Sequence, residues 1–306
     1  MAHIYDMVIL GGGPGGYTAA LYAARAGLDV IVLEKLSAGG QMALTHMVDN
    51  YPGFDSGIDG FELGMRMQAG AERFGAKTEL AEVLSVELEG EIKILHTSEG
   101  DFHGRTVVIA TGASPRKLGI PMEFELTGKG VNYCAHCDGM FYRGKTVVVA
   151  GGGNSAAADA LLLSRICEKV IVVHRRDSLR ATKVYHKPLM EAENVEFLWN
   201  SQIVELESSG KLSGVKVRDL PSGEERLVSC DGLFVSIGRK PASELFDGQL
   251  ELDQSGYIIA GESGQTSIPG VFAVGDVRTK ALRQIITAAS DGANAAHHAE
   301  EYLASL

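Results

Sequence analysis

The sequence predicts an α/β protein built from two Rossmann-like βαβ domains, one of which is inserted into the other. The chain has 306 residues, which suits two domains of about 150 residues each. It contains 38 glycines without a Gly-x-y period, and one glycine-rich turn recurs 140 residues further along. An excess of glycine favours tight turns and close approach of the backbone to a ligand.

The charge and the cysteine usage exclude several classes of function. The net charge is −11 and the basic residues are mostly scattered, so we expect no nucleic-acid or membrane partner. The N-terminus lacks the basic start of a signal peptide, and no apolar run reaches about 18 residues. Of the four cysteines, only Cys134 and Cys137 are closely spaced, which favours a reducing compartment. We therefore expect a cytoplasmic protein.

The first glycine-rich turn has the spacing of a dinucleotide-binding signature. Its three glycines are Gly11, Gly13 and Gly16. A strand is predicted over 7–10, a helix over 17–26 and a second strand over 30–33, which ends at Glu34. A carboxylate at that strand end can accept hydrogen bonds from both hydroxyls of an adenosine ribose. The alternative is an ordinary glycine-rich turn.

The same pattern recurs further along the chain. Strands are predicted over 146–149 and 170–173, with a helix over 157–167 between them. The candidate nucleotide contacts in this second turn are Gly151, Gly153, Asn154 and Ser155. The sequence therefore predicts two dinucleotide sites.

The residues at the ends of the two second strands differ in charge. The position that corresponds to Glu34 is His174, which Arg175 and Arg176 follow directly, with Arg180 four residues later. A carboxylate repels the 2′-phosphate of NADPH, whereas guanidinium groups bind it by charge-assisted hydrogen bonds. The second site is therefore predicted to take NADPH. The alternative is a solvated basic loop.

Two further strands are predicted to end at a ligand, over 105–110 and 271–274. Polar or glycine residues follow them: Thr111, Gly112 and Asp276. Ligands of open α/β sheets bind outside the carboxyl ends of the strands. Because these two strand ends bracket the second repeat, we expect a discontinuous first domain over 1–113 and 243–306, with 114–242 inserted.

A Cys-x-x-Cys pair lies between the two glycine turns, at Cys134 and Cys137. This spacing indicates redox chemistry or metal binding. Structural zinc normally needs four ligands, and Cys167 and Cys230 are predicted to lie singly on a helix and on a strand. We therefore expect no metal, and two buried cysteines.

Two residues next to the cysteine pair could take part in the chemistry of its thiols. His136, when protonated, could lower the pKa of a neighbouring thiol, or it could be an exposed imidazole without a role. Asp138 could carry a proton to a departing thiolate, or it could cap a helix.

Taken together, these motifs resemble the low-molecular-weight thioredoxin reductases, which are FAD- and NADPH-dependent disulfide oxidoreductases. The matching segments, in order, are 11–16, 39–41, 50–53, 110–112, 134–139, 151–156, 174–176 with Arg180, 275–277 and 283–285. The position of the dithiol, 17 residues before Gly151, makes the combination specific.

The resemblance implies FAD at the first site, NADPH at the second, and a dithiol that exchanges with thioredoxin. It also implies rotation between the domains and a homodimer formed through the FAD domains. Further FAD contacts are implied for Gln41, Asn50, Asp276 and Gln284.

The chain departs from the family pattern at Asn154, Asp159 and His136. The first two departures affect the expected affinity for the nicotinamide half of the cofactor, and the third affects the expected redox potential of the cysteine pair. The alternatives are a reductase of another thiol carrier or of a peroxiredoxin system, a flavin dithiol oxidase that does not use NADPH, and an inactive flavin-binding sensor.

Overall fold

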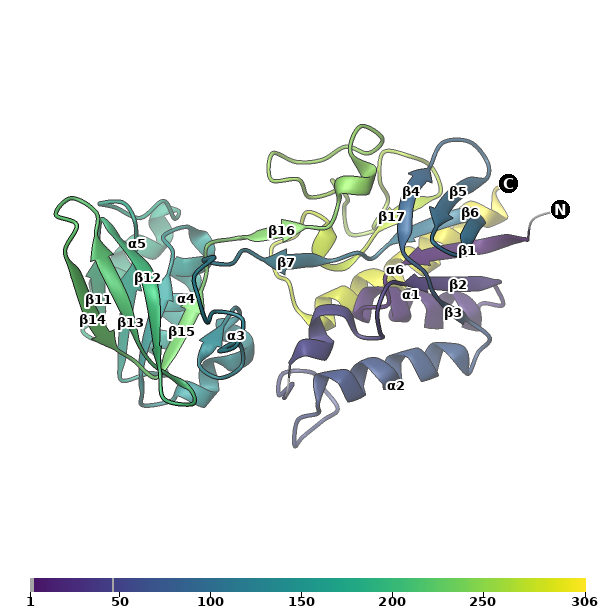
Figure 1. Cartoon of the computed structure of the whole chain (residues 1–306). Coiled ribbons are helices and arrows are strands. Elements are labelled where there is room, and N and C mark those ends of the chain that lie inside the picture. Colours follow the sequence, from purple (N-terminus) through teal and green to yellow (C-terminus); the bar gives the residue numbers. More distant parts are fainter. Residues whose placement is uncertain (1–2, 46) are drawn as a thin grey trace. The chain divides into compact units, whose positions relative to one another are not determined.

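The computed structural model describes residues 3–45 and 47–306 and divides into two compact units (Figure 1). Unit 1 comprises Met1–Ser114 and Lys240–Leu306, and unit 2 comprises Pro115–Arg239. The sequence predicts that the chain passes from the first domain to the inserted one at 113/114 and returns at 242/243. Residues 1, 2 and 46, which the predicted 1–113 segment includes, lie outside the described residues.

Unit 1 is built on a seven-stranded sheet in the order β3-β2-β1-β6-β5-β4, with β17 also paired to β6. The strands are β1 (Ile4–Leu10), β2 (Val30–Glu34), β3 (Lys77–Leu80), β4 (Val83–Glu87), β5 (Lys93–Thr97), β6 (Gly100–Ile109) and β17 (Val271–Ala273). The helices are α1 (Pro14–Arg25), α2 (Gly60–Glu72) and α6 (Ile285–Ala304), with 3-10 turns η1 (Gly40–Leu44), η4 (Glu244–Phe246) and η5 (Gly275–Val277). Two short strands, β7 (Ala113–Pro115) and β16 (Arg239–Pro241), pair with each other at the crossings.

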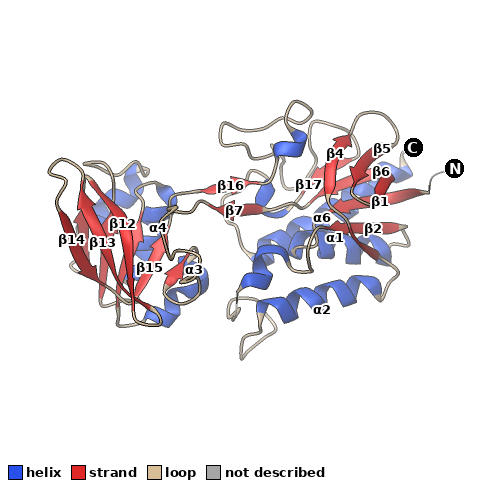
Figure 2. Ribbon diagram, viewed as in Figure 1, coloured by secondary structure: helices blue, strands red, loops and turns tan. Residues whose placement is uncertain are grey.

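The five strands β3, β2, β1, β6 and β17 are parallel, whereas β5 and β4 are antiparallel to their neighbours. Successive side chains of a strand point to opposite faces of its sheet. Met7 and Ile9 therefore pack with α1, α2 and α6, while Val8 and Leu10 pack with the β4 region and the 246–260 segment. Unit 1 thus has three layers, with helices on one face of the sheet (Figure 2).

Unit 2 repeats this plan with a five-stranded parallel sheet in the order β11-β10-β9-β15-β8. Its strands are β8 (Val131–Asn132), β9 (Thr146–Ala150), β10 (Lys169–Val173), β11 (Val195–Leu198) and β15 (Gly232–Val235). An antiparallel sheet follows, made of β12 (Ser201–Ser208), β13 (Leu212–Asp219) and β14 (Glu225–Ser229). The helices are α3 (Ala135–Asp138), α4 (Asn154–Ser164) and α5 (His186–Met190), with 3-10 turns η2 (Gly139–Tyr142) and η3 (Lys183–Tyr185).

The two faces of β9 are buried by different layers. Val147 and Val149 pack with α4, whereas Val148 and Ala150 pack with the antiparallel sheet. Burial on both faces explains the continuous apolar run of this strand. The predicted fold class, α/β with two Rossmann-like domains, is confirmed.

The structure corrects the ends of two predicted helices. The first begins at Pro14, where proline suits the first helical position, and the helix predicted over 157–167 is Asn154–Ser164. The last helix is Ile285–Ala304, because Gln284 is its N-cap and donates its backbone N–H to Thr287 Oγ1 at 3.1 Å. Among the described residues, no helix has the length and apolar character needed to span a membrane.

Gly292 of α6 packs directly against α1. A Cβ at this position would collide with the carbonyl oxygen of Gly15 and would lie 2.8 Å from the backbone nitrogen of Ala19. We expect Gly292→Ala to destabilise the protein by about 1 to 3 kcal/mol through overpacking. Urea unfolding followed by circular dichroism measures the change.

Gly70 in α2 provides the matched control, because a Cβ there would meet no atom within 4 Å. Gly70→Ala is expected to stabilise the helix by about 0.5 to 1 kcal/mol. Equal effects of the two substitutions would contradict the packing assigned to Gly292.

Candidate nucleotide and dithiol sites

The first glycine turn requires close contact between backbone segments. Gly11 has a φ of +102°, and a Cβ there would lie 2.6 Å from the carbonyl oxygen of Ala110 at the end of β6. A Cβ at Gly16 would collide with the carbonyl oxygen of Gly11. In contrast, a Cβ at Gly13 would meet no atom within 4 Å. The turn is therefore packed on its sheet side and open where a pyrophosphate could approach.

Glu34 ends β2 beside this turn. Its Oε2 accepts a hydrogen bond from the backbone N–H of Gly12 at 2.7 Å, and its Oε1 accepts one from that of Leu36 at 3.1 Å. These bonds fix a half-exposed carboxylate at the end of the second strand. The position suits an acceptor for the hydroxyls of an unphosphorylated adenosine ribose.

Three other segments with predicted FAD contacts converge on the same turn. The backbone N–H of Gly39 donates to the carbonyl of Gly12 at 2.8 Å, which brings η1, with Gln41, to the turn. A Cβ at Gly15 would lie 3.1 Å from the side chain of Val274, next to Gly275 and Asp276. The strand end at 110–112 borders Gly11 in the same way.

The remaining predicted contacts are held by side-chain hydrogen bonds. Asn50 Nδ2 donates to Oε1 of Gln284 at 3.0 Å, so the structure brings together two residues that are 234 positions apart. The Thr111 hydroxyl donates to the carbonyl of Ala242 at 2.6 Å, and Gly112 has a φ of +72°. The structure thus places Gln41, Thr111, Gly112 and Asp276 in segments that border the first turn, and it pairs Asn50 with Gln284.

Sequence reasoning missed Tyr17, which borders the first turn. Its ring is buried, and a Cβ at Gly12 would lie 2.9 Å from its hydroxyl. Burial raises the pKa of Tyr17 to about 12, so the phenol stays neutral. The only signal for this residue in the sequence is its place one position after Gly16.

The second turn has the same backbone geometry. Gly151 has a φ of +138°, and a Cβ there would lie 2.5 Å from the carbonyl oxygen of Ser236 at the end of β15. A Cβ at Gly153 would meet no atom within 4 Å. Asn154 and Ser155 are exposed in the first turn of α4, and Asn154 Oδ1 accepts the backbone N–H of Thr182 at 2.7 Å.

The basic residues after β10 separate into an exposed and a buried group. Arg175, Arg176 and Arg180 are exposed, and the structure shows no ion pair for them among residues 3–45 and 47–306. The backbone N–H of Arg180 donates to the carbonyl of Gly152 at 2.7 Å, which fixes this arginine beside the turn. Three guanidinium groups are thus available to an anionic ligand at the second turn.

His174 lies beneath the turn rather than on its surface. It is 6% exposed, and a Cβ at Gly152 would lie 2.5 Å from its ring. Burial, together with the nearby arginines, lowers the pKa of His174, so its imidazole is neutral at pH 7. The ring packs against the buried side of the turn, and it fits there because Gly152 has no Cβ.

Asp159, one of the departures from the family pattern, lies on α4 close to the second turn. Its Oδ2 accepts the hydroxyl of Ser236 at 2.5 Å. Burial raises the pKa of this carboxyl, against the opposing effect of that hydrogen bond. The residue therefore links α4 to the end of β15, the strand that Gly151 also contacts.

Cys134 and Cys137 form a disulfide with their Cα atoms 5.3 Å apart. Cys134 is the N-cap of α3, and its Sγ lies 3.2 Å from the backbone nitrogen of Cys137. Ala135 between them is buried in the same core as α4, and a Cβ at Gly139 would lie 3.2 Å from Leu163 of that helix. The segment that carries the disulfide is therefore packed onto the helix that begins at the second glycine turn.

Asp138 ends α3 directly after Cys137, and as the N-cap of η2 it makes no side-chain cap hydrogen bond. Burial raises the pKa of its carboxyl to about 6. A group that is partly protonated near neutral pH can donate a proton to a thiolate. His136, by contrast, is exposed.

The two other cysteines are buried, as predicted, but they lie outside regular elements. Cys167 follows α4 and Cys230 follows β14, so their predicted places on a helix and on a strand are wrong. The helix ends three residues early because its C-cap is Arg165. Burial raises the pKa of Cys167 to about 11 and that of Cys230 to about 12, so both stay protonated and unreactive.

Two nucleotide-type turns in separate units, with a disulfide in the same unit as the second, are typical of a disulfide oxidoreductase with two nucleotide sites. The chain belongs to the pyridine nucleotide-disulphide oxidoreductase family, whose pattern matches residues 5–292. The thioredoxin reductases of this family use FAD and NADPH.

Similar proteins support this assignment over the full length. A thioredoxin reductase of Streptomyces clavuligerus is 46% identical over 100% of this chain and 96% of its own. One of Bacillus subtilis is 43% identical, with 99% and 96% covered. The crystal structure of thioredoxin reductase from Streptococcus pyogenes has a TM-score of 0.93 and 41% identity, and all of both chains is covered.

The raised pKa of Asp138 predicts a pH-dependent stability. The unfolded carboxyl ionises near 3.8 and the folded one near 6, so the carboxylate costs stability as the pH rises between these values. Asp138→Asn should therefore be more stable than the wild type at pH 7.5, by about 1 to 3 kcal/mol. The advantage should vanish at pH 3.5, and urea unfolding at both pH values measures it. An advantage that is independent of pH would contradict the assignment.

Proposed function

We propose that this protein is an NADPH-dependent thioredoxin-disulfide reductase, in which unit 1 binds FAD and unit 2 binds NADPH and carries the redox disulfide. The observation that carries the proposal is the packing of α3, which carries the Cys134–Cys137 disulfide, onto α4, the helix of the second nucleotide turn. A homodimer in the cytoplasm is part of the proposal, and it rests on the family resemblance.

The FAD-binding residues of the proposal are those that converge on the first turn. Gly11, Gly13 and Gly16 would admit the pyrophosphate, and Glu34 would accept the ribose hydroxyls. Contacts to the rest of FAD are assigned to Gln41, Asn50, Thr111, Gly112, Asp276 and Gln284. When bound, FAD supplies two-electron transfer between nicotinamide and disulfide.

The NADPH-binding residues surround the second turn. Gly151 and Gly153 shape the turn, and Asn154 and Ser155 begin the helix whose N-terminus attracts phosphate. The guanidinium groups of Arg175, Arg176 and Arg180 would bind the 2′-phosphate, while His174 holds the turn from beneath. Lysine or histidine alone would not give the bidentate geometry of a guanidinium.

The dithiol reduces thioredoxin by thiol–disulfide exchange. One thiolate of this chain attacks the thioredoxin disulfide and forms a mixed disulfide, and one thioredoxin sulfur leaves as a thiolate. The second cysteine then attacks the mixed disulfide, which restores Cys134–Cys137 and releases reduced thioredoxin. Asp138 is assigned the proton transfer to a departing thiolate.

The division of the sites between the units has a mechanistic consequence. The FAD contacts belong to unit 1, whereas the NADPH contacts and the disulfide belong to unit 2. Both centres of unit 2 must react with the same flavin, so we propose that the units change their relative orientation during each cycle. Domain motions of this kind occur in microseconds to milliseconds and can limit turnover.

Replacement of either active-site cysteine tests the order of electron transfer. Cys134→Ser and Cys137→Ser should abolish NADPH-dependent thioredoxin reduction, because an exchange needs both sulfurs. Bleaching of the flavin absorbance by NADPH should persist, since hydride transfer precedes the disulfide. Stopped-flow absorbance measures both. Cys167→Ser is the matched control and should leave both rates unchanged. Loss of flavin reduction in the cysteine variants would contradict the proposed order.

Replacement of Arg175 and Arg176 by alanine tests the cofactor preference. Each lost charge-assisted hydrogen bond costs about 1.5 to 3 kcal/mol at most, so the Kd for NADPH should rise by about tenfold or more. The Kd for NADH should hardly change, because NADH lacks the 2′-phosphate. Arg226→Ala, which removes an exposed guanidinium from β14, is the control. An equal loss for both nucleotides would show that the two arginines do not bind the phosphate.

A further inference from the structure

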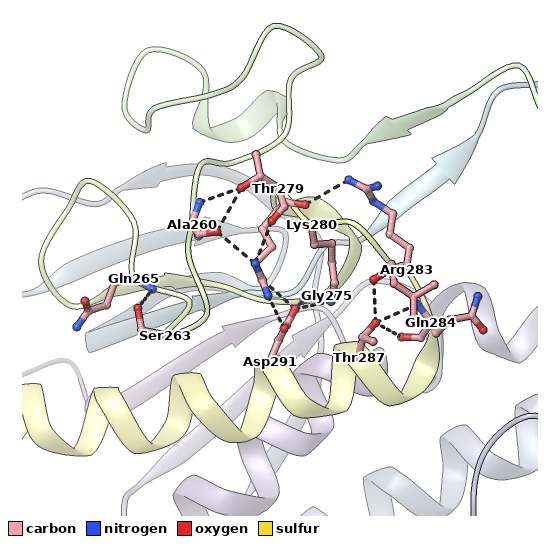
Figure 3. A network of polar contacts seen from close by, with 12 residues as sticks. Ala260, Ser263, Gln265, Gly275, Thr279, Lys280, Arg283, Gln284, Thr287 and Asp291 are labelled. Carbon is pink, nitrogen blue, oxygen red and sulfur yellow. Dashed lines mark hydrogen bonds and ion pairs between the residues drawn. The ribbon is translucent and has the colours of Figure 1, made fainter. Parts of the chain in front are cut away.

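A buried group of charges connects α6 to the loop between β17 and α6 (Figure 3). We name it the Asp291 cluster, and its charged members are Arg278, Lys280 and Asp291. The exposed fractions of these three side chains are 10%, 7% and 7%. Charged side chains are rarely buried unless they are paired. The proposed function gives this cluster no role, although its loop contains two of the proposed FAD contacts.

The carboxylate of Asp291 is the centre of the cluster. Its Oδ1 accepts Arg278 Nη2 at 2.6 Å. Its Oδ2 accepts Arg278 Nε at 2.9 Å, Lys280 Nζ at 2.7 Å and the backbone N–H of Gly275 at 2.9 Å. One side chain of α6 thus binds three positions of the loop. Because two cations share one carboxylate, removal of that carboxylate would leave both cations unpaired in the interior.

The loop is held at further points by Arg278 and Arg283. Arg278 Nη1 donates to the carbonyls of Ala260 and Thr279 at 3.2 and 2.9 Å. Arg283 lies over the ring of Tyr257, with its guanidinium carbon 4.1 Å from the ring centre. These contacts hold the middle of the loop and its end near α6, whereas the bond from Gly275 to Asp291 holds its start, next to Asp276.

The same turn of α6 also contacts the first nucleotide turn. Gly292, adjacent to Asp291, packs against the carbonyl of Gly15, and Gly15 in turn borders Val274. Residues 291–292 therefore join the first glycine turn, the end of β17 and α6. A shift of Asp291 would be transmitted to each of these segments, because protein interiors are close-packed.

We propose that Asp291 is a positioning residue of the flavin site, which holds Asp276 and the N-cap Gln284 in place for FAD through Gly275, Arg278 and Lys280. The inference rests on the proposed function. Lys280 has a second effect, because its charge also interacts with Asp276. Burial lowers the pKa of Lys280, and the hydrogen bond that its amine donates to Asp291 opposes this and favours the charged amine.

The test uses the purified holoprotein with Asp291→Asn and Glu301→Gln. Glu301 is an exposed acid of the same helix and serves as the control. FAD release on dilution is followed by the rise in flavin fluorescence, and folding is checked by circular dichroism. We expect Asp291→Asn to release FAD about tenfold faster or more, and Glu301→Gln to match the wild type. Release at the wild-type rate from folded Asp291→Asn would overturn the inference.

Lys280→Met decides the question if Asp291→Asn does not fold. This variant keeps the bonds of Asp291 to Arg278 and Gly275 but removes one positive charge beside Asp276. A more negative site disfavours flavin reduction, so the equilibrium against a reference dye should shift by about threefold to tenfold. That shift corresponds to about 15 to 30 mV for a two-electron couple. An unchanged equilibrium would overturn the inference, since a merely structural cluster would not alter the potential.

The wild type separates failure of this inference from failure of the proposed function. A wild-type protein that neither carries nor takes up FAD would contradict the proposed function itself. A wild type that holds FAD, with variants that hold it equally well and at the same potential, would refute only the role of Asp291.

Discussion

Close approach of backbone to backbone at the glycine turns is the constraint on which the rest of this structure depends. In each unit the first glycine of the turn faces a carbonyl at the end of a neighbouring strand, Ala110 for Gly11 and Ser236 for Gly151. A Cβ at either position would clash with that carbonyl oxygen. The contact places the start of a helix against the carboxyl edge of a parallel sheet, and the open side of the turn then points where a pyrophosphate can bind.

The two turns differ in what surrounds them, and this difference separates their chemistry. Glu34 accepts a backbone N–H beside the first turn, whereas the exposed Arg175 and Arg176 follow the corresponding strand in unit 2. The short helix that carries the disulfide packs onto the helix of the second turn. One unit therefore has basic residues beside its glycine turn together with the sulfur pair, and the other has a carboxylate beside its turn, which suits an unphosphorylated adenosine ribose.

Buried ionisable groups lie next to both sites and have different consequences. Burial raises the pKa of Asp138 to about 6, towards neutrality. Asp291 is also buried, but hydrogen bonds from Arg278 and Lys280 outweigh the cost of burial and lower its pKa. The first arrangement suits a group that exchanges protons, and the second suits a permanent charge that fixes a loop.

The sequence by itself determined the fold class, the two turns and the redox pair, because glycine spacing, strand-helix alternation and Cys-x-x-Cys spacing are local signals. It did not place Cys167 beyond the end of α4, since a helix end depends on capping and packing. Tertiary structure alone decided that His174 lies beneath its turn, that Asn50 meets Gln284, and that Asp291 anchors the loop of Gly275. These contacts join residues whose separation in the chain carries no periodic or spacing signal.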